Sequence, residues 1–335
     1  MRVALVVGTR PQLVKAAALL PELPGCLFVD TGQHWDGNMA GSFFDELDLP
    51  RPDYSLGVES GGLGMMIEAI EPVLRAELPD VVIVLGDTRS TLAAALAARS
   101  IRGVDLVHVE AGLRTFERDL PEEMARVVVD HIADRLFAPT NAAAMHLNHE
   151  GVVGVHNVGD VLADVVERFL EPARMLAVPF DPGAYIFATV HRAANRSPEA
   201  VDAWCRILAD APLPVVLALH PGTRAALGDR LLPLNVLDVG PVGYRDSLAL
   251  QMHAAAVVTD SGGIERESSW LGTPVVLLRE RSEWPELGAF RAGLDPERAA
   301  TALTSLHRRV VRIPSGASRL IAACLGYPAA ARSAA

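Results

Sequence analysis

The sequence predicts an α/β protein built from two doubly wound sheets of parallel strands. Short apolar runs alternate with helical patterns along the first half of the chain, the rhythm breaks near residue 170, and it then restarts. Such alternation is typical of βαβ units, in which a helix connects two parallel strands. A length of 335 residues also favours two domains over one. We therefore expect domains at residues 1–169 and 170–335.

The first half contains four apolar runs that we predict to be buried strands: VALVV (3–7), VVIVL (81–85), VDLVHV (104–109) and RLFAPT (135–140). Each is followed by a helical pattern. The first helix begins near Pro11, the second is the Ala-rich STLAAALAARS, and the third is PEEMARVVVDHIAD. Proline is well suited to the first turn of a helix because no backbone N–H is needed there.

The break is LEPARMLAVPFDPGAY (170–185), which carries three prolines and has no clear period. Five further runs follow it and are predicted to be strands with helices between them: YIFATV (185–190), PVVLALH (214–220), NVLDV (235–239), AAVVTD (255–260) and PVVLL (274–278). The second half thus repeats the organisation of the first.

Composition narrows the function classes. The net charge is −11, with carboxylates spread along the chain, so the basic stripe of a nucleic-acid-binding protein is absent and no nucleic-acid partner is expected. Three widely spaced cysteines suggest a reducing compartment. No apolar stretch approaches the ~18 residues of a membrane span, and the first residues do not resemble a signal peptide. We expect a cytoplasmic protein without membrane contact.

Ligands of doubly wound sheets bind beyond the carboxyl ends of the strands. Unusual polar residues gather there, in GTRPQLVK, TGQHWD, LGDTRST and HVEAGLRTFERDLPEE of the first half and in TVHRAAN, LHPGTR and TDSGGIERE of the second. These motifs supply the candidate site residues.

The motif TDSGGIERE joins a predicted strand to a predicted helix. Gly262 and Gly263 would leave backbone N–H groups accessible at the helix start, and Ser261 would cap it, which is the requirement for an anion site. A capped helix without a ligand is the alternative. Glu267 lies one turn into the helix. It could accept a hydrogen bond from a sugar hydroxyl, or it could only complement the helix dipole.

Arg10 lies at the end of the first strand. Its guanidinium could bind a phosphate through two hydrogen bonds, or the residue could have only a structural role. Lys15 follows in the same segment and is the single lysine among 30 Lys and Arg residues. The sequence lacks G-x-G-x-x-G, so hydride transfer by a bound dinucleotide is not supported.

Carboxylates follow two successive strands. Asp87 could be the N-cap of the next helix, whereas Glu110 should lie near the buried end of its strand. Glu122 and Glu123 follow Pro121 and could simply complement the helix dipole. Three carboxylates at one sheet edge would raise one another's proton affinity, which is a route to acid/base function.

Two histidines end successive strands of the second half, His191 and His220. They have no neighbouring Cys or Asp at ligand spacing, so no metal site is expected. His108 lies inside an apolar strand and is predicted to be a hydrogen-bonded core residue.

Taken together, the motifs resemble the non-hydrolysing UDP-N-acetylglucosamine 2-epimerases. The matching segments appear in the family's order: GTRPQLVKAA, TGQHWDGNM, LGDTRSTLAAALAA, HVEAGLRT, LPEEMARVVVDHIADRLFAPT, VGDV, VHRAAN, HPGTR and TDSGGIERES. The resemblance spans about residues 1–290. It implies a GT-B architecture, in which two Rossmann-like domains face a cleft and a C-terminal helix returns to the first domain, and it implies a homodimer that acts on a UDP-sugar in cell-surface polysaccharide biosynthesis.

The implied reaction inverts C2 of the sugar without oxidation and without a cofactor. The C2 proton is removed while UDP leaves from C1, an enzyme-held 2-acetamidoglucal forms, and UDP adds back after the proton returns on the other face. The family's catalytic positions match Asp87, Glu110, Glu122 and His191. Its substrate- and UDP-binding positions match Arg10, Lys15, His220, Ser261, Gly262, Gly263 and Glu267.

Several positions depart from the commonest family pattern. They include Ala193 and Ala194 in HRAAN, Glu265 and Arg266 in SGGIERE, and Trp284 in EWPE. Trp35 and Asp36 do not match the allosteric residues of members activated by a second UDP-N-acetylglucosamine.

The pattern looks closer to a subgroup that includes epimerases of UDP-2,3-diacetamido-2,3-dideoxyglucuronate, so the C3 and C6 substituents of the sugar stay open. The same motifs are compatible with a hydrolysing epimerase and, less closely, with a GT-B glycosyltransferase or a non-catalytic nucleotide-sugar sensor.

Overall fold

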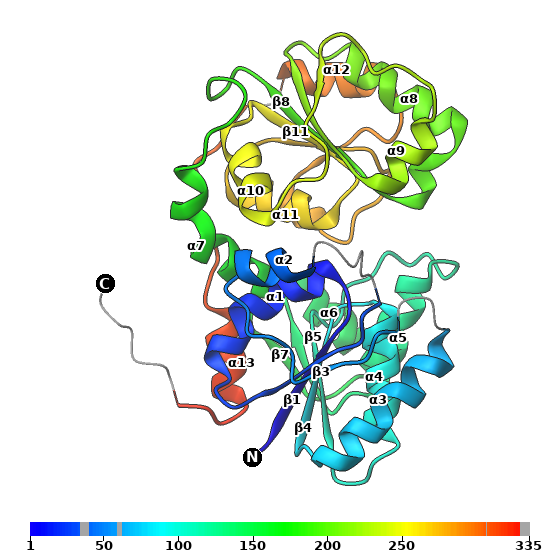
Figure 1. The fold of residues 1–335 in the computed structure, drawn as a ribbon, viewed down its shortest axis with the longest axis vertical. Helices are drawn as coiled ribbons and strands as arrows, with labels where there is room; N and C mark the ends of the chain where they lie inside the picture. The colour runs from blue at the N-terminus through cyan, green and yellow to red at the C-terminus, as the bar shows by residue number, and fades with distance from the viewer. Residues whose placement is uncertain (34–39, 59–61, 306, 329–335) are drawn as a thin grey trace. The chain divides into compact units, whose positions relative to one another are not determined.

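The computed structural model describes residues 1–33, 40–58, 62–305 and 307–328, and the chain divides into two compact units (Figure 1). The first unit runs from Met1 to Val165 and includes the segment that begins at Pro314, and the second runs from Val166 to Ile313. Among the described residues, no helix is long and apolar enough to cross a membrane.

The first unit contains a parallel sheet in the order β3-β2-β1-β4-β5-β6-β7. Its described strands are β1 (Val3–Val7), β2 (Leu27–Asp30), β3 (Tyr54–Ser55), β4 (Val81–Leu85), β5 (Asp105–Val109), β6 (Arg135–Ala138) and β7 (Val155–Asn157). Strands β1 and β4 are buried along their whole length, as their unbroken runs of Val, Ile and Leu require.

Helices cover both faces of this sheet (Figure 1). They are α1 (Arg10–Leu19), the short 3₁₀ helix η1 (Leu20–Glu22), α2 (Ala40–Glu46), α3 (Leu63–Glu77), α4 (Arg89–Arg99), α5 (Pro121–Ile132), α6 (Asn141–His149), α7 (Val161–Arg174) and α13 (Ala317–Cys324). Helix α7 continues into the second unit.

Helix α4 is the central helix of one face. Its alanines Ala93, Ala94, Ala97 and Ala98 are fully buried, since small side chains let the helix approach both the sheet and the neighbouring helices α3 and α5. On the other face α13 packs against α1 and η1. Asp164 anchors the start of α13 by accepting hydrogen bonds from the backbone N–H groups of Gly316 and, at 2.6 Å, Ser318.

The second unit repeats the design with a parallel sheet in the order β10-β9-β8-β11-β12-β13. Its described strands are β8 (Ile186–Val190), β9 (Val215–Leu219), β10 (Val236–Asp238), β11 (Ala256–Thr259), β12 (Val275–Leu277) and β13 (Phe290–Arg291). Its α-helices are α8 (Pro198–Ala209), α9 (Pro221–Leu227), α10 (Tyr244–His253), α11 (Gly262–Trp270) and α12 (Pro296–Ser305), with 3₁₀ helices η2 (Ala193–Arg196) and η3 (Pro285–Leu287).

The predicted fold class is confirmed, because both sheets have the doubly wound strand order of Rossmann-like domains. Every apolar run that we predicted to be a strand contains one, with ends that differ by at most two residues. The prediction did not include the four-residue strand β2, nor β3, β7 and β13, which are edge strands of only two or three residues. Such short pairings leave little periodic signal in a sequence.

The strand order places one topological switch point in each sheet. The switch lies between β1 and β4 in the first unit and between β8 and β11 in the second. Ligands of doubly wound sheets bind beyond the carboxyl ends of the strands at such a point. The predicted site residues follow these strands and their neighbours β5 and β9, so we describe them one unit at a time.

Candidate active site

Lys15 and Glu110 form a buried ion pair at the switch point of the first unit. Lys15 lies on α1, which follows β1, and Glu110 follows β5 directly. Their side chains are 9% and 4% exposed. The one lysine of the chain therefore neutralises a carboxylate that was expected at the end of a buried strand.

The backbone of Glu110 is in the left-handed region, with φ of 68°. A residue other than glycine rarely adopts this conformation, and such strain persists only where the surroundings hold it. The loop after Glu110 is held in several places: the N–H of Ala111 donates to the carbonyl of Phe137, and the N–H of Gly112 donates to Asp130. These contacts hold the backbone of Glu110 in the left-handed conformation.

Gly86 makes room for this carboxylate. Its φ is +63°, and a Cβ added to it would lie 3.0 Å from Oε2 of Glu110 and 3.7 Å from Nζ of Lys15. Its carbonyl is bound by Nε2 of His108, whose Nδ1 contacts Asp130 at 2.7 Å. His108 is fully buried, which confirms the prediction of a hydrogen-bonded core histidine.

Asp87 follows β4 and forms an ion pair with Arg126 of α5. The interpretation of Asp87 as the cap of the next helix is wrong: the N-cap of α4 is Thr88, whose hydroxyl oxygen accepts from the N–H of Thr91 at 3.2 Å. The Asp87 carboxylate is thus not occupied by capping, and 32% of its side chain is exposed.

The two glutamates of PEEMAR differ in environment. Glu122, the predicted catalytic residue, is exposed, whereas Glu123 is buried. Glu123 accepts hydrogen bonds from the backbone N–H groups of Thr115 (3.0 Å) and Phe116 (2.8 Å) and from Arg126 (2.7 Å). Arg126 therefore joins Glu123 to Asp87, and no sequence motif had indicated this bridge.

These contacts correct the electrostatic expectation for the three carboxylates. Glu110 faces Lys15, Asp87 faces Arg126, and Glu122 is exposed. Glu110 and Asp87 are each paired with a cation and not with one another. The structure therefore does not contain the group of mutually repelling carboxylates that the sequence suggested.

Gln12 ties the loop after β1 to the loop after β4. Its side-chain oxygen accepts from the N–H groups of Gly8 (2.9 Å) and Thr9 (3.1 Å), and its amide donates to the carbonyl of Leu85 (2.8 Å) and the hydroxyl of Thr91 (2.9 Å). The two sides of the switch point are thereby fixed in register.

Arg10 is the first residue of α1 and is exposed at the same edge. Its guanidinium lies 4.9 Å from the ring centre of Phe43. The ring supports the guanidinium from one side while leaving its N–H groups accessible to an anion.

In the second unit, His191 follows β8 and binds a buried carboxylate. Its Nδ1 lies 2.7 Å from Oδ1 of Asp260, the residue that follows β11. The imidazole is 44% exposed and the Asp260 side chain is fully buried. Burial opposes ionisation of this carboxyl, but the hydrogen bond and charge of His191, with further N–H donors, lower the pKa of Asp260 to about 2.

Ser261 is the N-cap of α11, as predicted, and its hydroxyl accepts from the N–H of Ile264 at 3.4 Å. Gly262 and Gly263 are the first two residues of this helix. A Cβ added to Gly263 would meet nothing closer than the hydroxyl oxygen of Ser261, at 3.7 Å, whereas one added to Gly262 would come within 3.8–4.0 Å of Arg279, Glu283 and Trp284. Glu267 is buried one turn later and accepts from the amide of Gln251 at 2.8 Å.

His220 is exposed at the end of β9 and caps the short helix α9. Its Nδ1 accepts from the N–H of Gly222 at 3.1 Å, which leaves the proton of a neutral ring on Nε2. Arg196, in the loop after β8, donates to the carbonyl of His191 at 2.5 Å. A Cβ added to Gly222 would lie only 2.8 Å from the guanidinium carbon of Arg196, so this side chain packs closely against the loop after β9.

Two of the departures from the family pattern contact one another. The guanidinium of Arg266 lies 4.3 Å from the ring centre of Trp284. Glu265 accepts from Ser282 (2.7 Å) and Arg279 (2.9 Å), although burial raises its pKa. Glu265, Arg266 and Trp284 therefore belong to one buried cluster beside the start of α11.

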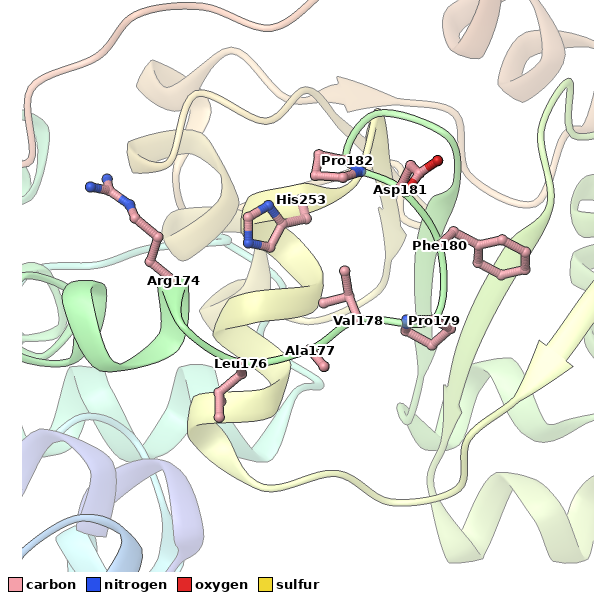
Figure 2. Close-up of a pocket in the computed structure, with 9 residues that line it drawn as sticks. All are labelled: Arg174, Leu176, Ala177, Val178, Pro179, Phe180, Asp181, Pro182 and His253. Atoms are coloured by element: carbon pink, nitrogen blue, oxygen red, sulfur yellow. The ribbon is translucent and has the colours of Figure 1, made fainter.

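A pocket of about 620 Å³ in the second unit is separate from these residues (Figure 2). It is lined by the segment between α7 and β8, together with Arg174 and His253. His253 ends the helix that precedes β11, so the pocket lies at the amino ends of the strands, opposite the switch point.

Trp35 and Asp36, which were compared with the family's allosteric residues, lie outside the described residues. No cluster of three or more His, Cys, Asp or Glu side chains suited to a metal ion occurs in the described part of the chain.

The fold defines a GT-B-like enzyme, with carboxylates after the strands of one unit and a glycine-containing helix start after a strand of the other. The chain belongs to the UDP-N-acetylglucosamine 2-epimerase family, whose model matches residues 25–308. It is accordingly a UDP-sugar 2-epimerase, in the class of isomerases.

Relatives and solved structures agree with this assignment. The chain is 39% identical over 305 residues to the UDP-2,3-diacetamido-2,3-dideoxy-D-glucuronate 2-epimerase of Pseudomonas aeruginosa, and the match covers 86% of each chain. It is 36% identical to a UDP-N-acetylglucosamine 2-epimerase of Methanococcus maripaludis, covering 88% of this chain and 89% of the relative. The structure of the Methanocaldococcus jannaschii UDP-GlcNAc 2-epimerase in complex with UDP-GlcNAc and UDP matches with a TM-score of 0.90 and 32% identity, over 98% of this chain and 100% of the other.

Proposed function

We propose that the protein interconverts UDP-N-acetylglucosamine and UDP-N-acetylmannosamine by elimination and re-addition of UDP. The observation that carries the mechanism is the buried Lys15–Glu110 pair, whose carboxylate is held at a strained backbone position at the switch point. Strain retained at such a place points to function rather than to stability.

In the proposed first step, a carboxylate of the first unit takes the C2 proton while the bond from C1 to the UDP oxygen breaks. The products of this step are UDP and a 2-acetamidoglucal. In the second step a proton is delivered to the opposite face of C2 and the UDP oxygen adds again to C1. Glu110 and Asp87, which stand after neighbouring strands, are the proposed proton-transfer residues, and the exposed Glu122 stays a third candidate.

We assign the diphosphate to the start of α11, with Ser261, Gly262 and Gly263, because helix-start N–H groups favour an anion. His191 and His220 are proposed to donate to the same group. Arg10 of the first unit is proposed as a UDP-binding residue from its match to the family position and from its exposed guanidinium. Glu267 is proposed to accept from the ribose, and its bond to Gln251 supports this by fixing the carboxylate. The assignment explains why these residues follow the central strands of their sheets.

A second substrate is favoured by the relative in Pseudomonas aeruginosa, which is an epimerase of UDP-2,3-diacetamido-2,3-dideoxy-D-glucuronate. The cluster of Glu265, Arg266 and Trp284 departs from the common family pattern beside the proposed diphosphate site. The same C2 chemistry would apply, with different groups at C3 and C6 of the sugar.

Proton NMR in D₂O tests the function. With UDP-N-acetylglucosamine we expect deuterium at C2 and formation of UDP-N-acetylmannosamine. Release of UDP and free N-acetylmannosamine would instead assign the protein to the hydrolysing branch. The diacetamido uronate is tested in parallel, and C2 that stays unlabelled in both sugars would contradict the proposal.

The homodimer and a role in cell-surface polysaccharide biosynthesis stay predictions from the family resemblance, and the cytoplasmic location stays a prediction from the cysteines and apolar stretches of the sequence. Light scattering on the purified chain measures the oligomeric state directly.

Arg10→Ala is expected to weaken UDP binding by about 10- to 100-fold, the loss of one charge-assisted hydrogen-bonding group. Isothermal titration with UDP measures it. Arg51→Ala is the matched control, since Arg51 also lies over a phenylalanine ring, at 5.5 Å from that of Phe44, but follows α2 instead of β1. Equal affinities for the two variants would remove Arg10 from the proposed UDP-binding residues.

A further inference from the structure

Asp260 is a fully buried carboxylate at the switch point of the second unit, and neither the motifs nor the family resemblance had singled it out. Besides its contact with Nδ1 of His191, the carboxylate accepts hydrogen bonds from the backbone N–H groups of His191 (3.0 Å) and Arg192 (2.9 Å). It also accepts one from the side-chain amide of Asn195 (2.8 Å). Both carboxylate oxygens are used, so the carboxylate has one orientation.

Its position connects the start of α11 to the loop that carries His191, both of which are proposed to contact the diphosphate. Asp260 lies directly before Ser261, the N-cap of α11, and its partners lie in the loop after β8. The strands that carry the two loops are adjacent in the sheet, and the hydroxyls of Thr189 and Thr259 meet at 2.7 Å just before them. The imidazole is thus fixed relative to the helix start by a short chain of contacts.

The contact also defines what the exposed ring can do. A carboxylate acceptor places a proton on Nδ1, so the other nitrogen, Nε2, is the one available to a ligand. A second proton on Nε2 makes it a charged donor, and the buried carboxylate stabilises that imidazolium. Such a donor would stabilise the negative charge that develops on a leaving diphosphate.

We propose that Asp260 is the positioning residue of His191: it orients the imidazole so that Nε2 donates to the diphosphate of the departing UDP. The inference rests on the proposed function. It predicts that Asp260 contributes to the rate only through His191, which separates it from a residue that merely joins two loops.

Asp260→Asn should lower kcat by about 10- to 100-fold, a size typical of groups that orient a functional histidine, with KM within about threefold. In a His191→Gln background the same change should cost less than about twofold, because the group on which it acts is already gone. Equal losses in both backgrounds would overturn the proposal. Asp295→Asn is the matched control, because Asp295 is a loop carboxylate of the same unit that also accepts two backbone N–H groups.

Nitrogen-15 NMR of ring-labelled histidine in the wild-type protein provides a readout that needs neither turnover nor a folded Asp260 variant. The His191 signals are assigned from their loss in His191→Gln. We expect the neutral ring to carry its proton on Nδ1, and a neutral ring protonated on Nε2 would overturn the inference. If the sugar at C2 is not exchanged but Nδ1 is protonated, the proposed function fails while the contact stands.

Discussion

Glu110→Gln is expected to lower C2 proton exchange by about 10²- to 10⁴-fold, the contribution typical of a positioned proton-transfer group. The amide keeps the size of the side chain and an oxygen for Lys15, but it cannot take up the C2 proton. Affinity for UDP should stay within several-fold of wild type, because Glu110 is not assigned to the diphosphate. NMR in D₂O measures the exchange, and titration with UDP measures the binding.

Glu77→Gln is the matched control for this change. Glu77 is also a paired carboxylate of the first unit, bound to Arg2, but it ends α3 just before β4 and so lies at the amino ends of the strands. We expect wild-type exchange for this variant. An unaltered rate in Glu110→Gln would remove Glu110 from the mechanism, whereas equal losses in both variants would indicate damage to the fold.

The backbone pattern of these units was predictable because it depends on local sequence. Runs such as VVIVL and PVVLALH are long enough to show a buried strand, and STLAAALAARS shows a helix that is buried on most sides. The strand order then follows from a few rules for parallel sheets, and with it the edge at which ligands bind. Arg10, Asp87, Glu110 and His191 could be placed at this edge before any contact was known.

The partners of these residues could not be predicted, because they depend on side chains that are distant in the sequence. Lys15 and Glu110 are 95 residues apart, and His191 and Asp260 are 69 apart. The sequence also did not distinguish neighbouring residues: the cap is Thr88 and not Asp87, and of Glu122 and Glu123 it is the second that is buried. A shift of one residue turns a side chain by about 100° around a helix, which composition cannot resolve.

Arg126→Met is expected to destabilise the protein by about 3–5 kcal/mol, because it leaves the buried Glu123 without its cation. The Arg126 and Glu123 side chains are both only 5% exposed, and the same guanidinium reaches Asp87. Loss of the bridge should also lower C2 exchange, since Asp87 would no longer be held in place. Urea unfolding at neutral pH measures the stability, and NMR in D₂O measures the exchange.

Arg99→Met makes the same substitution at an arginine of the same unit that is 44% exposed and bonded to Asp134 at 2.8 Å. An exposed pair contributes only about 0–1 kcal/mol, so this variant should be close to wild type in both measurements. Arg126→Lys adds a further distinction, since a single ammonium keeps the charge but lacks the two separate N–H arms that reach Glu123 and Asp87. If Arg126→Lys recovers stability but not exchange, the bridge positions Asp87 for the reaction. If it recovers both, the charge of Arg126 is sufficient and the fork geometry is not required.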